Sequence, residues 1–214
     1  SYQSLADETK AQYDAMVADG IKIEPYTGKG EPYASSKEML KDVADNKHLW
    51  FFTTDEGFGS GDEADASHPL LQKTGVVING HELVYNDLFR AVHDYFGHTK
   101  GNFQFGAGGE YNAFLAHSDM FTDEAIPALA AETLAQNAWV NYGKHIRRED
   151  GTMPQKGDED FTAVRDRPFA DQKTFVVPQD RMPDDLSTEQ VVQTDTAAFK
   201  SWFKDSKVVD ADGK

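Results

Sequence analysis

The 214-residue chain contains no cysteine. Disulfide bonds and thiolate metal sites are therefore both excluded, and any bound metal must use histidine, carboxylate or amide ligands. Basic residues are also scarce, because 21 Lys and Arg stand against 37 Asp and Glu and give a formal net charge of −16. A nucleic-acid groove needs clustered Lys and Arg, so we expect no nucleic-acid partner.

Long apolar runs are missing as well. No stretch approaches the roughly 20 apolar residues of a membrane-spanning helix, and no signal-peptide pattern opens the chain. The acidic surface implied by the net charge would also be repelled by anionic membranes. We therefore expect a cytoplasmic protein with no membrane partner.

The length and composition are those of one globular domain. Apolar residues make up 39% of the chain and aromatic residues 12%, and no break in composition divides it, so we expect a single domain over 1–214. Periodicity and turn signals predict an α+β fold, with a mainly helical centre and a small antiparallel sheet or hairpin beside it. The predicted elements are helices at 4–20, 35–46, 86–97, 109–121, 123–143 and about 187–203, strands at 21–26, 48–53 and 174–177, a loop at 57–67 and a hairpin at 76–84.

The stretch from about 85 to 143 carries most of the chemistry. His93, His98 and His117 are three of the seven histidines, and they share this otherwise aromatic and apolar region with Glu110 and Glu132. A metal site is the simplest chemistry that requires this mixture of residues. We therefore predict a metal-site core over 85–143.

His93 and His98 lie five residues apart in a predicted helix. On an ideal α-helix they would point about 140° apart, because each residue turns about 100°. They can share a metal only if the helix ends or distorts at Gly97, a residue that readily takes the left-handed conformation of a helix end. The alternative is that Asp94 pairs with Arg90 on the surface and that both histidines are ordinary core or rim residues.

Glu110 and His117 fall on one face of the next predicted helix, with Phe114 between them. An acid and a histidine among phenylalanines are costly to bury unless they are paired or bind a metal. Both direct ligation and a Glu110–His117 hydrogen bond stay open. Glu110 follows Gly109 at a helix N-terminus, where the helix dipole already stabilises a carboxylate, so we expect the hydrogen bond to satisfy it.

The segment 125–143 is apolar on most sides and contains no lysine or arginine. A carboxylate is rarely buried on such a helix without a function, so we predict that Glu132, rather than Glu110, joins His93 and His98 as the third metal ligand. Gln136 and Asn137 are expected to form a polar wall that contacts a bound cofactor. The alternative is an internal polar network that only fixes helix packing.

Two histidines and one carboxylate are the ligands that hold Fe(II) on one face and leave other positions open. Zinc with a bound water is the competing use of the same ligands. The run His93-Asp94-Tyr95-Phe96-Gly97-His98 resembles the His-Glu-x-x-Gly-His motif of the biopterin-dependent aromatic amino acid hydroxylases, in which a glutamate from a later helix completes a non-haem iron site. Glu132 matches that glutamate. Asp94 replaces the motif's glutamate and the proline-rich lead-in is missing, so the resemblance implies the iron more than the pterin.

A wider resemblance covers 21–143, which is similar to a region of polyvalent proteins encoded by phages and mobile elements. It is carried by the phrases at 45–49, at 85–90 with the run 93–98, and at 132–133 with 136–141. This resemblance implies a viral or metagenomic origin and no defined biochemistry.

Three functions follow from these observations. The first is a metal-dependent, non-haem iron, oxygenase- or hydroxylase-like protein that acts on a small-molecule substrate, in which Asp94, Glu110 and His117 support the ligands or transfer protons. The second is a zinc hydrolase with Glu110 or Asp94 as general base. The third is a non-catalytic phage accessory or interaction domain in which the polar cluster is structural.

Overall fold

A computed structural model describes residues 1–54 and 67–170. The predicted strand at 174–177, the predicted helix at 187–203 and nearly all of the predicted loop at 57–67 lie outside the described residues. The described part combines helices with two small sheets, which confirms the predicted α+β class.

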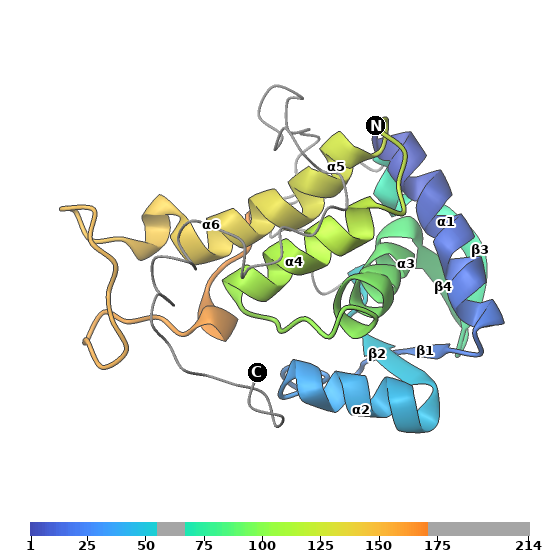
Figure 1. The fold of residues 1–214 in the computed structure, drawn as a ribbon, viewed down its shortest axis with the longest axis horizontal. Helices are drawn as coiled ribbons and strands as arrows, with labels where there is room; N and C mark the ends of the chain where they lie inside the picture. The colour runs from blue at the N-terminus through green and yellow to red at the C-terminus, as the bar shows by residue number, and fades with distance from the viewer. Residues whose placement is uncertain (55–66, 171–214) are drawn as a thin grey trace, which may run out of the picture.

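The helical centre is built around α3 (Tyr85–Val92). This helix runs without a break into a π-helical segment (His93–Thr99), and α1 (Tyr2–Ala18) packs across it (Figure 1). After a short loop the chain enters α4 (Ala107–Ser118), which packs against the π-helical segment. Two elements of the predicted metal-site core are thus brought into contact.

A second interrupted helix lies along α4 (Figure 1). It consists of α5 (Ile126–Ala130), a second π-helical segment (Ala131–Ala135) and α6 (Gln136–Tyr142). The sequence predicts one continuous helix here. In the structure the helix continues in one direction, but its middle turn is π-helical and therefore wider. Glu132 lies in that widened turn.

Two strands close one side of the helical centre. Strand β1 (Lys22–Pro25) pairs in parallel with β2 (His48–Phe51), and α2 (Ser36–Asn46) connects them. The sequence predicts both strands, but their parallel pairing is a feature of the tertiary structure alone.

The predicted hairpin is confirmed. Strand β3 (Lys73–Ile78) pairs antiparallel with β4 (His81–Val84) across a two-residue turn. Asn79 has φ 53° and Gly80 has φ 82°. Positive φ at both central residues is what a tight hairpin turn requires, which is why Asn-Gly predicts it.

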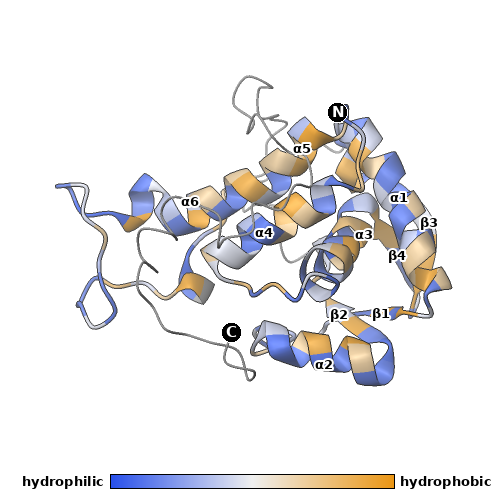
Figure 2. Cartoon of the chain, in the orientation of Figure 1, coloured by the Kyte–Doolittle hydropathy of each residue, from blue (hydrophilic) through white to orange (hydrophobic). Residues whose placement is uncertain are grey.

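Within the part of the chain that the structure describes, the core consists of two apolar clusters, and α3 contributes to both. Phe89 packs with Phe114 and Leu129 in one cluster, while Leu88 and Val92 pack in the other. Apolar and hydrophilic residues are interleaved along α1, α2 and α4, as expected for helices with one buried face (Figure 2). Because α3 is held on both sides, the segment that follows it has a rigid support.

In the described ranges, 1–54 and 67–170, every helix is too short or too polar to cross a lipid bilayer.

Candidate metal centre

A widened helical turn places the two histidines on one face. The amide of Lys100 donates to the carbonyl of Tyr95 at 2.9 Å and that of Phe103 to the carbonyl of His98 at 3.0 Å, and both bonds span five residues. The hydrogen bonds of a π-helix span five residues and widen its turn, so side chains five apart point much closer together than the roughly 140° of an ideal α-helix. The helix therefore does distort, as sharing a metal requires, but it does not end at Gly97, which keeps a negative φ.

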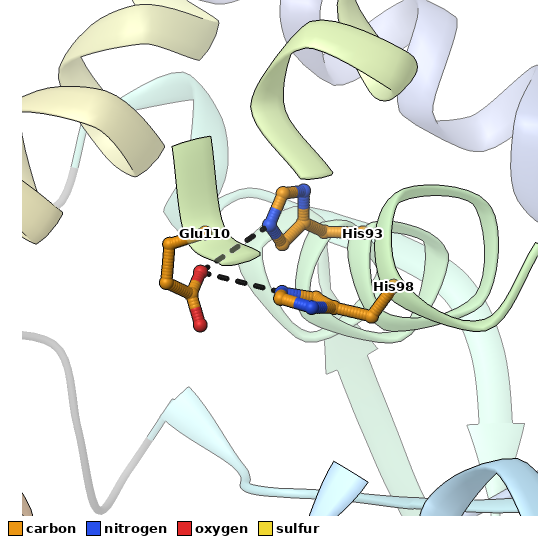
Figure 3. A group of neighbouring side chains, drawn as sticks. All are labelled: His93, His98 and Glu110. Atoms are coloured by element: carbon orange, nitrogen blue, oxygen red, sulfur yellow. Dashed lines mark hydrogen bonds and ion pairs between the residues drawn. The ribbon is translucent and has the colours of Figure 1, made fainter. Parts of the chain in front are cut away.

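Three potential ligand atoms meet at the start of α4. Glu110 Oε2 lies 3.3 Å from His98 Nε2 and 4.0 Å from His93 Nε2 (Figure 3). All three atoms lie within 4.8 Å of one another. A cation with ligand bonds of about 2.1 Å has neighbouring ligand atoms about 3.0 to 3.4 Å apart, so small movements would let this group hold one.

One of these atoms makes no hydrogen bond in the protein. His93 is 9% exposed and its Nε2 makes no hydrogen bond. A buried polar atom without a partner is costly, and native structures rarely retain one without a reason. A cation between the two imidazoles and Glu110 would satisfy it.

The electrostatics favour a charged Glu110. Burial alone would raise the pKa of this carboxyl, but His93 and His98 outweigh burial and lower the pKa to about 2. Burial would likewise lower the pKa of His98, yet the contact with Glu110 raises it instead. The cluster thus presents an ionised carboxylate, the form that binds metals.

Glu132 lines the same cavity as His93 but lies outside the ligand-distance group, so the geometry does not support its assignment as the third ligand. Among the described residues the ligand-distance group contains Glu110 and not Glu132. Glu132 is half-buried and accepts a hydrogen bond of 2.6 Å from the Tyr2 hydroxyl. Burial raises the pKa of Glu132, while Tyr2 and Arg90 oppose that rise. Tyr2 on α1 and Arg90 on α3 supply partners for Glu132, so its burial does not by itself require a metal.

The expected hydrogen bond between Glu110 and His117 is wrong. His117 Nδ1 instead lies 3.0 Å from His93 Nδ1, and His117 Nε2 lies 2.6 Å from Gln12 Oε1. His117 is completely buried, and burial, with His93 and His98 nearby, lowers its pKa well below the usual range. Sequence reasoning missed Gln12, whose only signal is a polar residue on the buried side of the first helix.

A cavity of about 460 Å³ opens beside the cluster, and His93 and Glu110 both line it. Its walls combine four phenylalanine rings with charged groups, among them Phe52, Phe89, Phe105, Phe169, Arg90, Asp94 and Glu132. Burial raises the pKa of Asp94, although His98, His93 and Arg90 oppose that rise. Asp94 lines the cavity together with His93 and Glu110, and a proton-transfer role for it stays a prediction.

Gln136 and Asn137 also line the cavity, but their amides hold the backbone in place. The Gln136 side chain donates to the carbonyl of Ala170 and accepts from its amide. Asn137 donates to the carbonyl of Ala107 at the start of α4 and accepts from Asn141. Both residues shape the cavity wall, and contact with a cofactor stays a prediction.

Gly97 allows α4 to approach the histidines. A Cβ at this position would lie 3.2 Å from both the Ala113 carbonyl oxygen and the His93 ring. We expect Gly97→Ala to displace the His93 ring and to weaken metal binding by about tenfold, as measured by isothermal titration with Zn²⁺. Gly108→Ala is the matched control, because a Cβ there meets no atom within 4 Å. Equal affinities of the two variants would contradict the expectation.

Comparisons of the chain with protein-family profiles, with curated proteins and with solved structures found no match. The two resemblances described above therefore remain predictions from short motifs, and the functional conclusion rests on the geometry of the site.

Proposed function

We propose that this chain is a metal-dependent, oxygenase-like protein in which His93, His98 and Glu110 hold Fe(II). The observation that carries the proposal is the convergence of two imidazole Nε2 atoms and one carboxylate oxygen beside a cavity of about 460 Å³. The buried Nε2 of His93, which makes no hydrogen bond, also supports it. The local likeness to the hydroxylase motif favours iron among the metals that accept these ligands.

Two histidines and one carboxylate leave other positions of the metal open, and bound iron would supply activation of dioxygen there. The chain's own residues would bind and orient a small-molecule substrate. Phe52, Phe89 and Phe105 offer apolar walls that exclude water, and Arg90 lies among the carboxylates of the cavity. Asp94 would hold or move a proton at its carboxyl oxygens.

A zinc-dependent hydrolase is the second candidate, because carboxylates that do not belong to the cluster line the same cavity, among them Asp94 and Glu132. Asp94 and Glu132 both have pKa values raised by burial. A carboxylate with a raised pKa can act as general base toward a metal-bound water. Metal identity and oxygen consumption separate the two candidates.

The test is metal content after reconstitution with Fe(II) under anaerobic conditions. We expect about one iron per chain in the native protein and in His48→Ala, and only background iron in His98→Ala, because loss of one of three ligands removes much of the affinity. His48 is a suitable control, since it lies on β2 with its Nδ1 2.7 Å from Asp42.

Background iron in the native protein, with no change in its melting temperature on addition of iron, would overturn the proposal. The polar cluster would then have a structural role only. Tight binding of zinc alone, without oxygen consumption by an iron-loaded sample, would favour the hydrolase.

A further inference from the structure

A line of buried polar groups connects α1 to the candidate metal centre. Gln12 is 6% exposed, and its amide nitrogen donates to the carbonyl of Met120 at 3.1 Å. A carbonyl can only accept, so this contact assigns the amide orientation and leaves Gln12 Oε1 facing His117 Nε2 at 2.6 Å.

The next two contacts assign the hydrogens on the two rings. An amide oxygen only accepts, so the hydrogen of a neutral His117 must be on Nε2, which leaves a lone pair on its Nδ1. That Nδ1 lies 3.0 Å from His93 Nδ1, and His93 must therefore be the donor. In a neutral His93 the remaining nitrogen, Nε2, then carries a lone pair, and it lies 4.0 Å from Glu110 Oε2.

We propose that Gln12 and His117 are positioning residues that hold His93 in the Nδ1–H form, so that its Nε2 presents a lone pair to the metal. This inference rests on the function proposed above. His98 Nδ1 lies 3.4 Å from the carbonyl of Phe103, which can only accept, and its Nε2 lies 3.3 Å from Glu110 Oε2, where a cation would replace the hydrogen on Nε2. Both histidines are thereby set to bind a cation through Nε2.

The two histidines differ in what supports them. A histidine that binds a metal usually donates a hydrogen bond from its second ring nitrogen to a carboxylate, a backbone carbonyl or water. His93 instead donates to a second histidine, which can equally well carry its hydrogen on the opposite nitrogen. Gln12 removes that freedom, so the metal-binding form of His93 depends on α1 being docked against the site.

Loss of Gln12 Oε1 should move the ring hydrogen of both His117 and His93 to the opposite nitrogen. His117 could then place its hydrogen on Nδ1 and donate to His93 Nδ1 instead. His93 would carry its hydrogen on Nε2, directed toward Glu110, and that nitrogen could no longer bind a metal. Partners of this kind typically contribute 10- to 100-fold to metal affinity, so we expect Gln12→Leu to weaken Zn²⁺ binding by about that factor.

The experiment measures the ring hydrogens of His93 directly, in metal-free full-length protein labelled with nitrogen-15 histidine. Two-bond proton–nitrogen spectra distinguish the Nδ1–H from the Nε2–H form. We expect Nδ1–H in the native protein, Nε2–H in Gln12→Leu, and recovery of Nδ1–H in Gln12→Glu, which keeps an acceptor. Gln3→Leu is the matched control on the same helix, because the Gln3 amide bonds only the exposed Asp7 in the contacts that the structure shows.

Nε2–H in the native protein, or Nδ1–H in a folded Gln12→Leu, would overturn the inference. If Gln12→Leu does not fold, His117→Phe removes the acceptor of His93 and keeps a ring among Phe89, Phe96 and Phe121, and the same switch is expected. Because these spectra need no metal, a tautomer switch in a protein that binds no metal would reject the proposed function and leave the assigned hydrogen positions intact.

Discussion

Glu110→Gln is expected to weaken metal binding by about 100-fold or more, whereas Glu132→Gln should change the affinity by less than about threefold. Glu110 Oε2 is the atom that faces both His98 Nε2 and His93 Nε2, and a neutral amide replaces its charge without changing the side-chain shape. Glu132 is instead held by the Tyr2 hydroxyl. Competition titration with Zn²⁺ against a chromogenic chelator measures both affinities.

The two variants form a matched pair, since each changes one cavity-lining glutamate to glutamine. Melting temperatures of the metal-free proteins, recorded beside the titrations, separate a loss of ligand from a loss of fold. A large loss of affinity in Glu132→Gln together with native affinity in Glu110→Gln would restore the ligand set that the sequence predicts.

Asp87→Ala is expected to lower the free energy of unfolding by about 3 to 4 kcal/mol. Asp87 is 1% exposed and its carboxylate accepts three hydrogen bonds. The amide and hydroxyl of Thr54 lie 2.7 and 2.6 Å from Oδ1, and the amide of Val84 lies 2.9 Å from Oδ2. Alanine would leave these buried donors without a partner at the start of α3, the helix that carries the histidines.

Urea denaturation of the metal-free protein measures the loss. Asp87→Asn keeps one acceptor oxygen and should cost about half as much. Asp123→Ala is the control, because this aspartate is exposed and its removal should change stability by less than about 0.5 kcal/mol. Equal stabilities of Asp87→Ala and Asp123→Ala would show that the carboxylate does not hold α3 in place.

The amino-acid sequence by itself determined much of the secondary structure of residues 1–54 and 67–170, and the region of the candidate site. The Asn79–Gly80 turn, the strands at β1 and β2 and the helices that carry the histidines follow from backbone preferences and apolar periodicity, which act between neighbouring residues. The pair His93 and His98 was also identifiable from sequence. These features share a physical reason, since the interactions that specify them span only a few residues.

Only the tertiary structure decided which acid faces the histidines and what supports them. The Tyr2 hydroxyl donates to Glu132, and the Gln12 side chain contacts His117, which lies more than a hundred residues later in the sequence. Side chains of α1 thus provide the hydrogen-bond partners of polar groups on later helices. The π-helical turn that aligns the two histidines is likewise outside an ideal helical pattern. A carboxylate on an apolar helix predicts that a partner must exist, but its burial cost is the same whether that partner is a metal or a tyrosine, and only packing distinguishes the two.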